Sequence, residues 1–266
     1  MLLSLSRLGW IRPLLTASSV AIVVFLLCPL VLLMVLSFGS SQWFEFPPHS
    51  FTFRWYQSII ANPEWMQSLA TSLEVGCVVA LLSVLLGTLS AFGIMRCPAR
   101  IRGSLETVFL LPMIFPVVVT AVSVYLFFST THLNGTFVGF VIGHLVIALP
   151  FAVSAVLNGL KELDGAVEDA AVLCGASRLQ AAFRVTLPAL KSSLTSAAVF
   201  SFLASWDDVV VAIFMSSPSL QTIPVKIWGN LQQDLSPDIA AVSTFLIVSS
   251  GIVIFCMNRV QGGAEE

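Results

Sequence analysis

The chain has 266 residues, of which 57% are hydrophobic and only 10% are charged, and its mean hydropathy is +0.97. This composition excludes an ordinary soluble domain, in which about 25% of residues are charged. We therefore predict an all-α, polytopic membrane protein.

Six apolar runs are long enough to cross a membrane. A membrane-spanning helix needs about 20 mostly apolar residues to cross roughly 30 Å of hydrocarbon. Pro112 and Pro116 interrupt the third run, and Asp207 and Asp208 interrupt the fifth, which predicts a helix break or a water-lined face at both places. The predicted spans cover approximately residues 14–38, 68–95, 105–129, 137–160, 191–215 and 238–258 of a single transmembrane domain.

The positive charges divide unequally between the two sides of this topology. Cytoplasmic loops of membrane proteins carry an excess of Lys and Arg. Six spans put both termini on one side, and the opposite side holds only Arg54 and Lys226 of the twelve positive residues. Both termini are therefore predicted to be cytoplasmic. The cytoplasmic set is Arg7, Arg12, Arg96, Arg100, Arg102, Lys161, Arg178, Arg184, Lys191 and Arg259.

An external loop on this topology, residues 40–67, contains four large aromatic side chains. Amphipathic rings prefer the membrane–water interface. We interpret these rings as interfacial, with an aromatic binding site as the alternative. They are Trp43, Trp55, Tyr56 and Trp65.

The sequence contains no motif of a nucleotide-binding or hydrolytic site. Walker, G-x-S-x-G, H-E-x-x-H and glycine-rich dinucleotide patterns do not occur. The five cysteines have no C-x-x-C spacing. The chain is therefore predicted not to be an enzyme, to hold no cofactor or metal, and to depend on another protein for its energy source.

The loop between the fourth and fifth runs, residues 161–188, has the pattern of two short helices. Asp164 is placed to cap the first helix, and Gly175 suits the left-handed residue that ends it. Ser177 and Gln180 have the spacing of a capping box, so a second helix is predicted to start there and to end just before Pro188. The expected element is a helix-turn-helix on the cytoplasmic face.

A stripe of small apolar residues runs along the first of these helices. Such a stripe permits close backbone approach and suits a helix that docks in a groove of a partner protein. On the pattern alone, a surface hairpin that packs on its own bundle is the alternative. The stripe consists of Val167, Ala170, Ala171 and Cys174.

The same segment, from Asp169 to Pro188, reads D-A-A-x3-G-x9-V-x-L-P. It resembles the E-A-A-x3-G-x9-I-x-L-P signature of the membrane subunits of binding-protein-dependent ABC importers. The resemblance implies a coupling helix that docks in a cleft of the cytoplasmic ATPase subunit. The implied coupling residues are Asp169 as the charged anchor, Ala170 and Ala171 as the close-packing surface, Gly175 as the turn, and Leu187 and Pro188 at the end of the signature.

The resemblance also implies an architecture and a set of partners. The fold would be that of a type I ABC importer permease in the bacterial inner membrane. Two membrane subunits would switch a central cavity between outward and inward openings. The implied partners are two cytoplasmic ATP-binding subunits, a second and related permease subunit, a periplasmic solute-binding protein and membrane lipid; no nucleic acid is expected.

Three carboxylates are candidates for the solute path. Asp207 and Asp208 lie about 13 residues into the fifth run, or roughly 20 Å across the membrane, and Glu74 lies at comparable depth in the second run. An ionised carboxylate there costs at least about 2.5 kcal/mol, so it should face a cavity or a partner. Three acids around one outward-facing vestibule would favour a cationic solute. A cap of a broken helix, or a pair with the sister subunit, is the alternative for either aspartate.

The stretch from Ser205 to Val211 resembles the S-[FW]-D-D-[FV]-V-V pattern of spermidine and putrescine importer permeases. The resemblance implies polyamine import. The same permease role for iron, sulfate or an opine-like compound is the alternative, and an ion-coupled secondary transporter is a further one, although no internal repeat is found. His144 in the fourth run is expected to bond a neighbouring helix, with a proton or substrate contact as the alternative.

Overall fold

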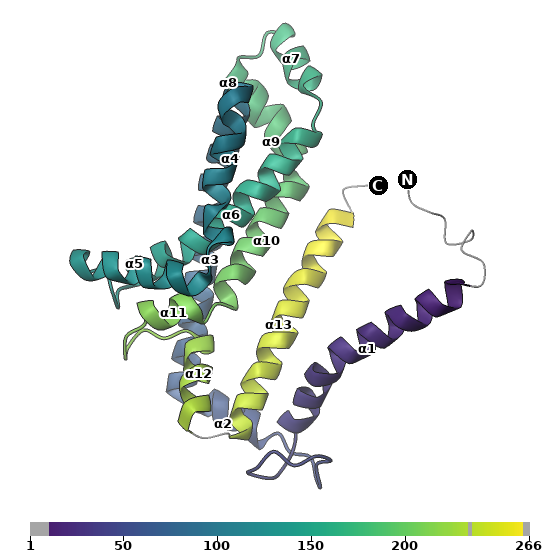
Figure 1. The fold of residues 1–266 in the computed structure, drawn as a ribbon, viewed down its shortest axis with the longest axis vertical. Coiled ribbons are helices and arrows are strands. Elements are labelled where there is room, and N and C mark those ends of the chain that lie inside the picture. The colour runs from purple at the N-terminus through teal and green to yellow at the C-terminus, as the bar shows by residue number, and fades with distance from the viewer. Residues whose placement is uncertain (1–10, 234–235, 263–266) are drawn as a thin grey trace. The chain divides into compact units, whose positions relative to one another are not determined.

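The computed structural model describes residues 11–233 and 236–262 (Figure 1). Within these ranges the regular structure is helical, with two isolated β-bridges and no strand. The all-α prediction is confirmed.

The chain divides into two compact units: one holds the residues up to Asn62 with Asn230–Ser249, and the other holds Pro63–Gly229 and the residues from Ser250 on. Arg7 of the charge count lies outside the described residues.

Four helices in the described ranges are long and apolar enough to cross a membrane. The number rises to six if each of two bent helix pairs counts as one span. The described part of the chain therefore has the helices that a multi-pass topology needs. The four long helices are α1 (Ile11–Ser37), α3 (Pro63–Arg96), α6 (Phe137–Glu162) and α13 (Pro237–Gly262).

The third apolar run is broken at Pro116, as predicted. Helices α4 (Ala99–Ile114) and α5 (Val117–Thr131) meet there at 96°. Proline disfavours the helical conformation of the residue before it, and Phe115 accordingly has an extended ψ of 144°. Pro112 lies inside α4 and does not end it. Only the second of the two prolines breaks the helix.

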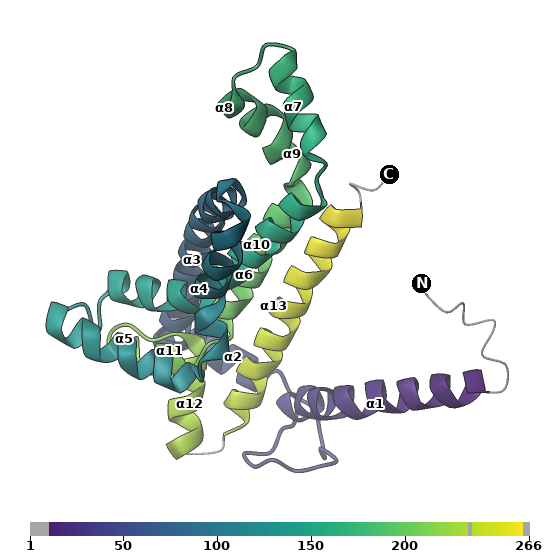
Figure 2. The same ribbon diagram turned by 45° about the horizontal axis from the view of Figure 1, so that its top comes forward.

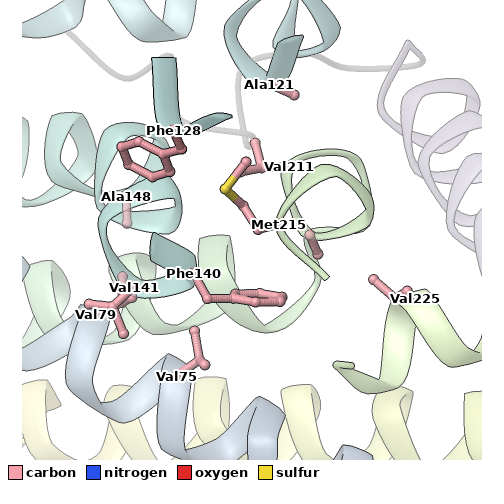
Figure 3. Close-up of a cluster of buried hydrophobic side chains, with 11 residues drawn as sticks. Val75, Val79, Ala121, Phe128, Phe140, Val141, Ala148, Val211, Met215 and Val225 are labelled. Atoms are coloured by element: carbon pink, nitrogen blue, oxygen red, sulfur yellow. The ribbon is translucent and has the colours of Figure 1, made fainter. Parts of the chain in front are cut away.

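The fifth run is also broken, and its second part does not continue the span. Helix α10 (Lys191–Trp206) ends immediately before the two aspartates, and α11 (Val210–Met215) begins after them. Val211 and Met215 of α11 are fully buried and meet Phe140 of α6 in a hydrophobic cluster (Figure 3). The predicted span 191–215 is therefore one helix up to Trp206 and a separate, inward-packed turn beyond it.

Helices α3, α6 and α10 pack against one another in the larger unit (Figures 1 and 2). Glycines allow the close approach. A Cβ atom on Gly87 of α3 would lie 2.8 Å from the Cβ of Ala152 on α6, and one on Gly159 of α6 would collide with Ser193 of α10. Small residues are typical of such contacts, because lipid provides no hydrophobic force that drives helices together.

Gly87 and Gly93 give a matched test of this packing. A Cβ on Gly87 meets the backbone of α6 as well as Ala152, whereas a Cβ on Gly93 of the same helix meets nothing within 4 Å. Gly87→Ala is therefore expected to destabilise the protein by about 1–3 kcal/mol, the usual cost of overpacking. Gly93→Ala should be neutral or stabilising by up to about 1 kcal/mol. Thermal unfolding in detergent measures both, and equal midpoints for the two variants would contradict the packing described.

Short helices complete the structure, and several of them were not predicted. The smaller unit contains α2 (Arg54–Ala61), and α12 (Ile223–Gln233) follows α11. The hydroxyls of Ser37 and Tyr56 lie 2.7 Å apart and tie the end of α1 to α2. Of the four rings expected at the interface, Trp43 is 75% exposed, whereas Trp65 is only 5% exposed. The segment between α6 and α10 holds the remaining short elements.

Candidate functional site

The first helix of the 161–188 segment is α7 (Gly165–Leu173), and both of its ends are capped as predicted. The Asp164 carboxylate accepts a hydrogen bond of 2.9 Å from the Ala166 amide. At the other end Gly175 has a φ of +95°. The amides of Gly175 and Ala176 donate to the carbonyls of Val172 and Ala171, which is the Schellman arrangement.

The second helix begins with the predicted capping box. Ser177 Oγ accepts from the Gln180 amide at 3.2 Å, and Gln180 Oε1 accepts from the Ser177 amide at 2.9 Å. The helix then runs through α8 (Arg178–Ala181), a π-helical turn (Ala182–Thr186) and α9 (Leu187–Ala189). It meets α10 at an angle of 70°.

The predicted end of this second helix, just before Pro188, is wrong. Pro188 lies in the first turn of α9, directly after the π-helical turn. Inside a continuous helix a proline removes one backbone hydrogen bond and crowds the preceding turn, and in this chain that preceding turn is π-helical. The direction of the chain changes instead at Leu190, two residues later, where the backbone leaves the helical region with a ψ of 8°.

One hydrogen bond ties the two helices together. Thr186, which is buried, donates from Oγ1 to Oε2 of Glu168 at 3.2 Å. The ion pair between Asp169 and Arg178 is looser, at 4.0 Å, and both side chains are largely exposed. The position of α7 therefore depends on its caps and on the Glu168–Thr186 bond more than on apolar packing.

Helix α7 itself has an uncovered surface. None of its residues is buried, and Leu173 is 88% exposed. Asp169 and Ala170 are exposed as well, and Ala171 is half-buried. A helix of this length is marginal in water without tertiary contacts. The exposed face of α7 thus has the properties of a surface that another protein covers.

Gly175→Ala is expected to loosen α7 without any steric clash. A Cβ at this position meets nothing within 4 Å, so the cost comes from the positive φ alone, about 1–3 kcal/mol. Hydrogen exchange of the α7 amides should become faster. Gly165→Ala, also with open space around it, is the matched control at the start of the same helix and should leave exchange unchanged. Unaltered exchange in Gly175→Ala would show that the turn does not hold the helix.

The two adjacent aspartates of the fifth run have different surroundings. Asp208 Oδ2 accepts a hydrogen bond of 2.9 Å from the Ala212 amide, so this carboxylate caps α11. The same oxygen lies 3.7 Å from Nε2 of His144, whose side chain is fully buried. Nδ1 of His144 lies 2.7 Å from Ser205 Oγ, which links α6 to α10 as expected. For Asp208 the alternative of a cap on a broken helix is the one that the structure shows.

Asp207 and Glu74 lie elsewhere. Asp207 is the C-cap of α10; its side chain is exposed, with the Ser250 hydroxyl as its hydrogen-bond partner. Glu74 is exposed on α3, whereas Val75 and Gly76 next to it face the packed side of that helix. Among the described residues no hydrogen bond or ion pair joins Glu74 to either aspartate. The structure brings Asp208 and His144 together and does not bring Glu74 to them within this chain.

Comparison with known proteins identifies the family. Residues 83–263 match the model of the family described as "Binding-protein-dependent transport system inner membrane component". The chain belongs to this family. As a member of the binding-protein-dependent transport family, it is a multi-pass inner-membrane permease subunit of an ABC importer and not an enzyme; the ATPase is a separate subunit.

Individual relatives of this inner membrane component include polyamine permeases. The chain is 30% identical to the spermidine/putrescine transport system permease protein PotC of Escherichia coli (strain K12), over 90% of each chain. It is 28% identical to the putrescine transport system permease protein PotI of the same strain, over 91% of this chain and 88% of the other. A putative 2-aminoethylphosphonate transport system permease protein, PhnV of Salmonella paratyphi A, is 26% identical over 91% of this chain and 92% of the other.

The fold of the family is found in a solved structure. A chain of a bacterial ABC transporter involved in the import of the acidic polysaccharide alginate has a TM-score of 0.72, with 97% of this chain and 99% of that chain covered. The sequence identity is 17%, so this likeness concerns the fold alone.

Proposed function

We propose that this permease subunit forms part of the solute path of an ATP-driven importer of polyamines, putrescine and spermidine. The observation that carries the proposal is the similarity to the spermidine/putrescine permease PotC over nine tenths of both chains. The acidic pair Asp207 and Asp208 is consistent with a solute that carries several ammonium groups.

In this proposal the α7 hairpin is the coupling element. Both termini and α7 lie on the cytoplasmic side, and each of two permease subunits, this chain and a related one, contacts one of two ATPase subunits. Closure of the ATPase dimer moves the hairpins and switches the cavity between outward and inward openings. A periplasmic binding protein delivers the solute. The proposed contact residues are Asp169, Ala170, Ala171 and Gly175, with Leu187 and Pro188 at the junction to α10; exposure of the α7 face supports this role.

In this proposal the three acidic residues have different roles in solute recognition. Asp207 is the direct contact, because its carboxylate is exposed at the break between α10 and α11. Asp208 contributes its charge from within the protein while it caps α11. Glu74 would meet the solute at a separate point of the path, from the exposed side of α3. Two separate acidic contact points suit a linear molecule with an ammonium group at each end.

Uptake by cells tests the proposed solute. A strain without this gene should lose energy-dependent uptake of radiolabelled putrescine and spermidine at nanomolar to micromolar concentrations, and a plasmid copy should restore it. Uptake of labelled sulfate, ferric iron, an opine and 2-aminoethylphosphonate in the same strains provides the comparison. Loss of one of those solutes with intact polyamine uptake would replace the proposed substrate and leave the family assignment standing.

A further inference from the structure

An apolar groove of about 410 Å³ lies between α3, the second helix of the hairpin and the start of α10. Its two walls have matching patterns. Leu81, Leu85 and Leu89, spaced four residues apart, form the wall on α3, and the opposite wall has Leu179, Phe183 and Leu187 at the same spacing. We call this feature the α3 groove. Its volume lies within the range of roughly 300–1,000 Å³ that is typical of ligand pockets.

The walls of the α3 groove are exposed. Leu81 is 71% exposed and Leu89 is 63% exposed on α3, and on the facing helix Leu179 is 66% and Phe183 is 62% exposed. The α3 wall belongs to a membrane span, and the facing wall belongs to Arg178–Ala189, which together with α10 forms a bent helix pair apolar and long enough to count as one span. Apolar surface of this size is unfavourable in water, at about 25 cal/mol per Å². Both walls of the groove, along the part of α3 from Leu81 to Leu89, therefore present apolar side chains suited to contact with a lipid acyl chain.

One cation lies at the end of the groove. The guanidinium of Arg96 lies 5.9 Å from the ring centroid of Phe92, and both residues also line an adjoining polar cavity of about 520 Å³. Among the residues that the structure describes, no carboxylate pairs with Arg96.

The other cations that line the polar cavity are engaged. Lys161 pairs with Glu106 at 2.9 Å. Arg102 donates to the carbonyls of Met95 and Cys97 at the end of α3. Arg178 faces Asp169 across the turn of the hairpin. The carboxylates of Asp164, Glu168 and Asp169 line the polar cavity as well, so this cavity carries both charges. The arrangement thus offers an apolar channel that ends at Arg96, a cation with no acidic partner among the described residues.

We propose that the α3 groove binds one acyl chain of an anionic phospholipid, with the phosphate at Arg96, where the groove ends. A cation at the cytoplasmic end of a membrane helix attracts anionic headgroups, and the apolar walls distinguish a lipid from a free phosphate. Arg96 lies at the cytoplasmic end of α3 on the proposed orientation. A lipid in this position contacts both α3 and the second hairpin helix, and it would make the stability of the hairpin depend on the anionic lipid content of the membrane.

Photolabelling of the intact importer tests this proposal. The complex, purified through a tag on this chain, is placed in nanodiscs that contain trace phosphatidylglycerol with a photoreactive acyl chain, or phosphatidylcholine with the same chain. Mass spectrometry then locates the labelled peptides. We expect the phosphatidylglycerol probe to label residues 81–96 and 179–194 at least several-fold more than the phosphatidylcholine probe does. Excess unlabelled phosphatidylglycerol should remove the difference, and inorganic phosphate should not.

Two variants and a control separate the charge from the groove. Arg96→Gln should reduce phosphatidylglycerol labelling to the phosphatidylcholine level, whereas Arg100→Gln, an exposed arginine that does not line the groove, should not change it. Leu85→Trp should fill the groove and reduce labelling by both probes. Equal labelling by the two probes would overturn the proposal. Crosslinks to the second permease from Leu85→Cys and Phe183→Cys, in place of lipid labelling, would overturn it as well.

Discussion

Reversal of the charge at Asp169 is expected to abolish solute uptake while the permease still folds and reaches the membrane. The Asp169 side chain is 70% exposed, and its only ion pair among the residues that the structure describes is the 4.0 Å contact with Arg178. Exposed pairs of this kind contribute about 0–1 kcal/mol, so the fold should survive the substitution. In Asp169→Arg, two positive side chains would face each other on the proposed docking surface. We expect loss of ATPase co-purification and at least a tenfold drop in energy-dependent uptake.

Two further substitutions make the Asp169 experiment specific. Glu162→Arg gives the same change of charge at an exposed position at the end of α6, where a cation is favoured, and should leave uptake and co-purification unchanged. Asp169→Glu keeps the charge and should retain most of the activity. Normal ATPase association in Asp169→Arg would remove α7 from the interface.

Asp207→Asn is expected to weaken solute recognition. For Asp208, the effect of a substitution on stability should depend on whether the new side chain can still cap α11. A hydrogen bond between charged groups contributes about 1.5–3 kcal/mol, and each 1.4 kcal/mol is a factor of ten. Asp207→Asn should therefore raise the KM for putrescine and spermidine roughly tenfold to a hundredfold, without a change in thermal stability. Initial uptake rates over a range of solute concentrations measure this change.

The structure separates the two roles of Asp208. An Asn amide oxygen can still accept from the Ala212 amide, so Asp208→Asn should keep the cap of α11 and lose only the charge. Asp208→Leu removes the cap and leaves Nε2 of His144 without its acidic neighbour, so it should lower stability by about 1–3 kcal/mol. Leu at this position should reduce the amount of folded protein. Unchanged KM in Asp207→Asn together with unchanged stability in Asp208→Leu would exclude both roles.

The parts that the sequence predicted are those that local chemistry determines. Asp164, Gly175 and the Ser177–Gln180 pair act within a few residues of their own position, and all three features are present in the structure. Composition and run length likewise predicted the long helices. The break at Pro116 is consistent with the effect of proline on the residue before it, although Pro112 shows that a proline need not end the helix.

Features that depend on tertiary contacts were not predictable in the same way. An apolar stretch such as Val210–Met215 has the same sequence pattern whether it faces lipid or a protein core. Its inward packing was therefore not predicted. The different surroundings of Asp207 and Asp208 depend on where α10 ends. Ser205 belongs to the S-[FW]-D-D-[FV]-V-V pattern, but its bond to His144 joins residues far apart in the sequence and leaves no local signal. The π-helical turn before Pro188 also follows no local rule used for the prediction.

The glycine contacts in the bundle restrict how this subunit can move. With Gly87 and Gly159 in direct contact with their neighbours, α3, α6 and α10 have little room to slide along one another. Any large displacement would then carry the three helices as a rigid body. The flexing would then fall at the breaks between helices, among them Phe115 and Pro116 in the third apolar run, Leu190 before α10, and residues 207–209 in the fifth. Asp207, proposed to contact the solute directly, would thus lie at one of the breaks between helices, whereas Glu74 would move with the bundle.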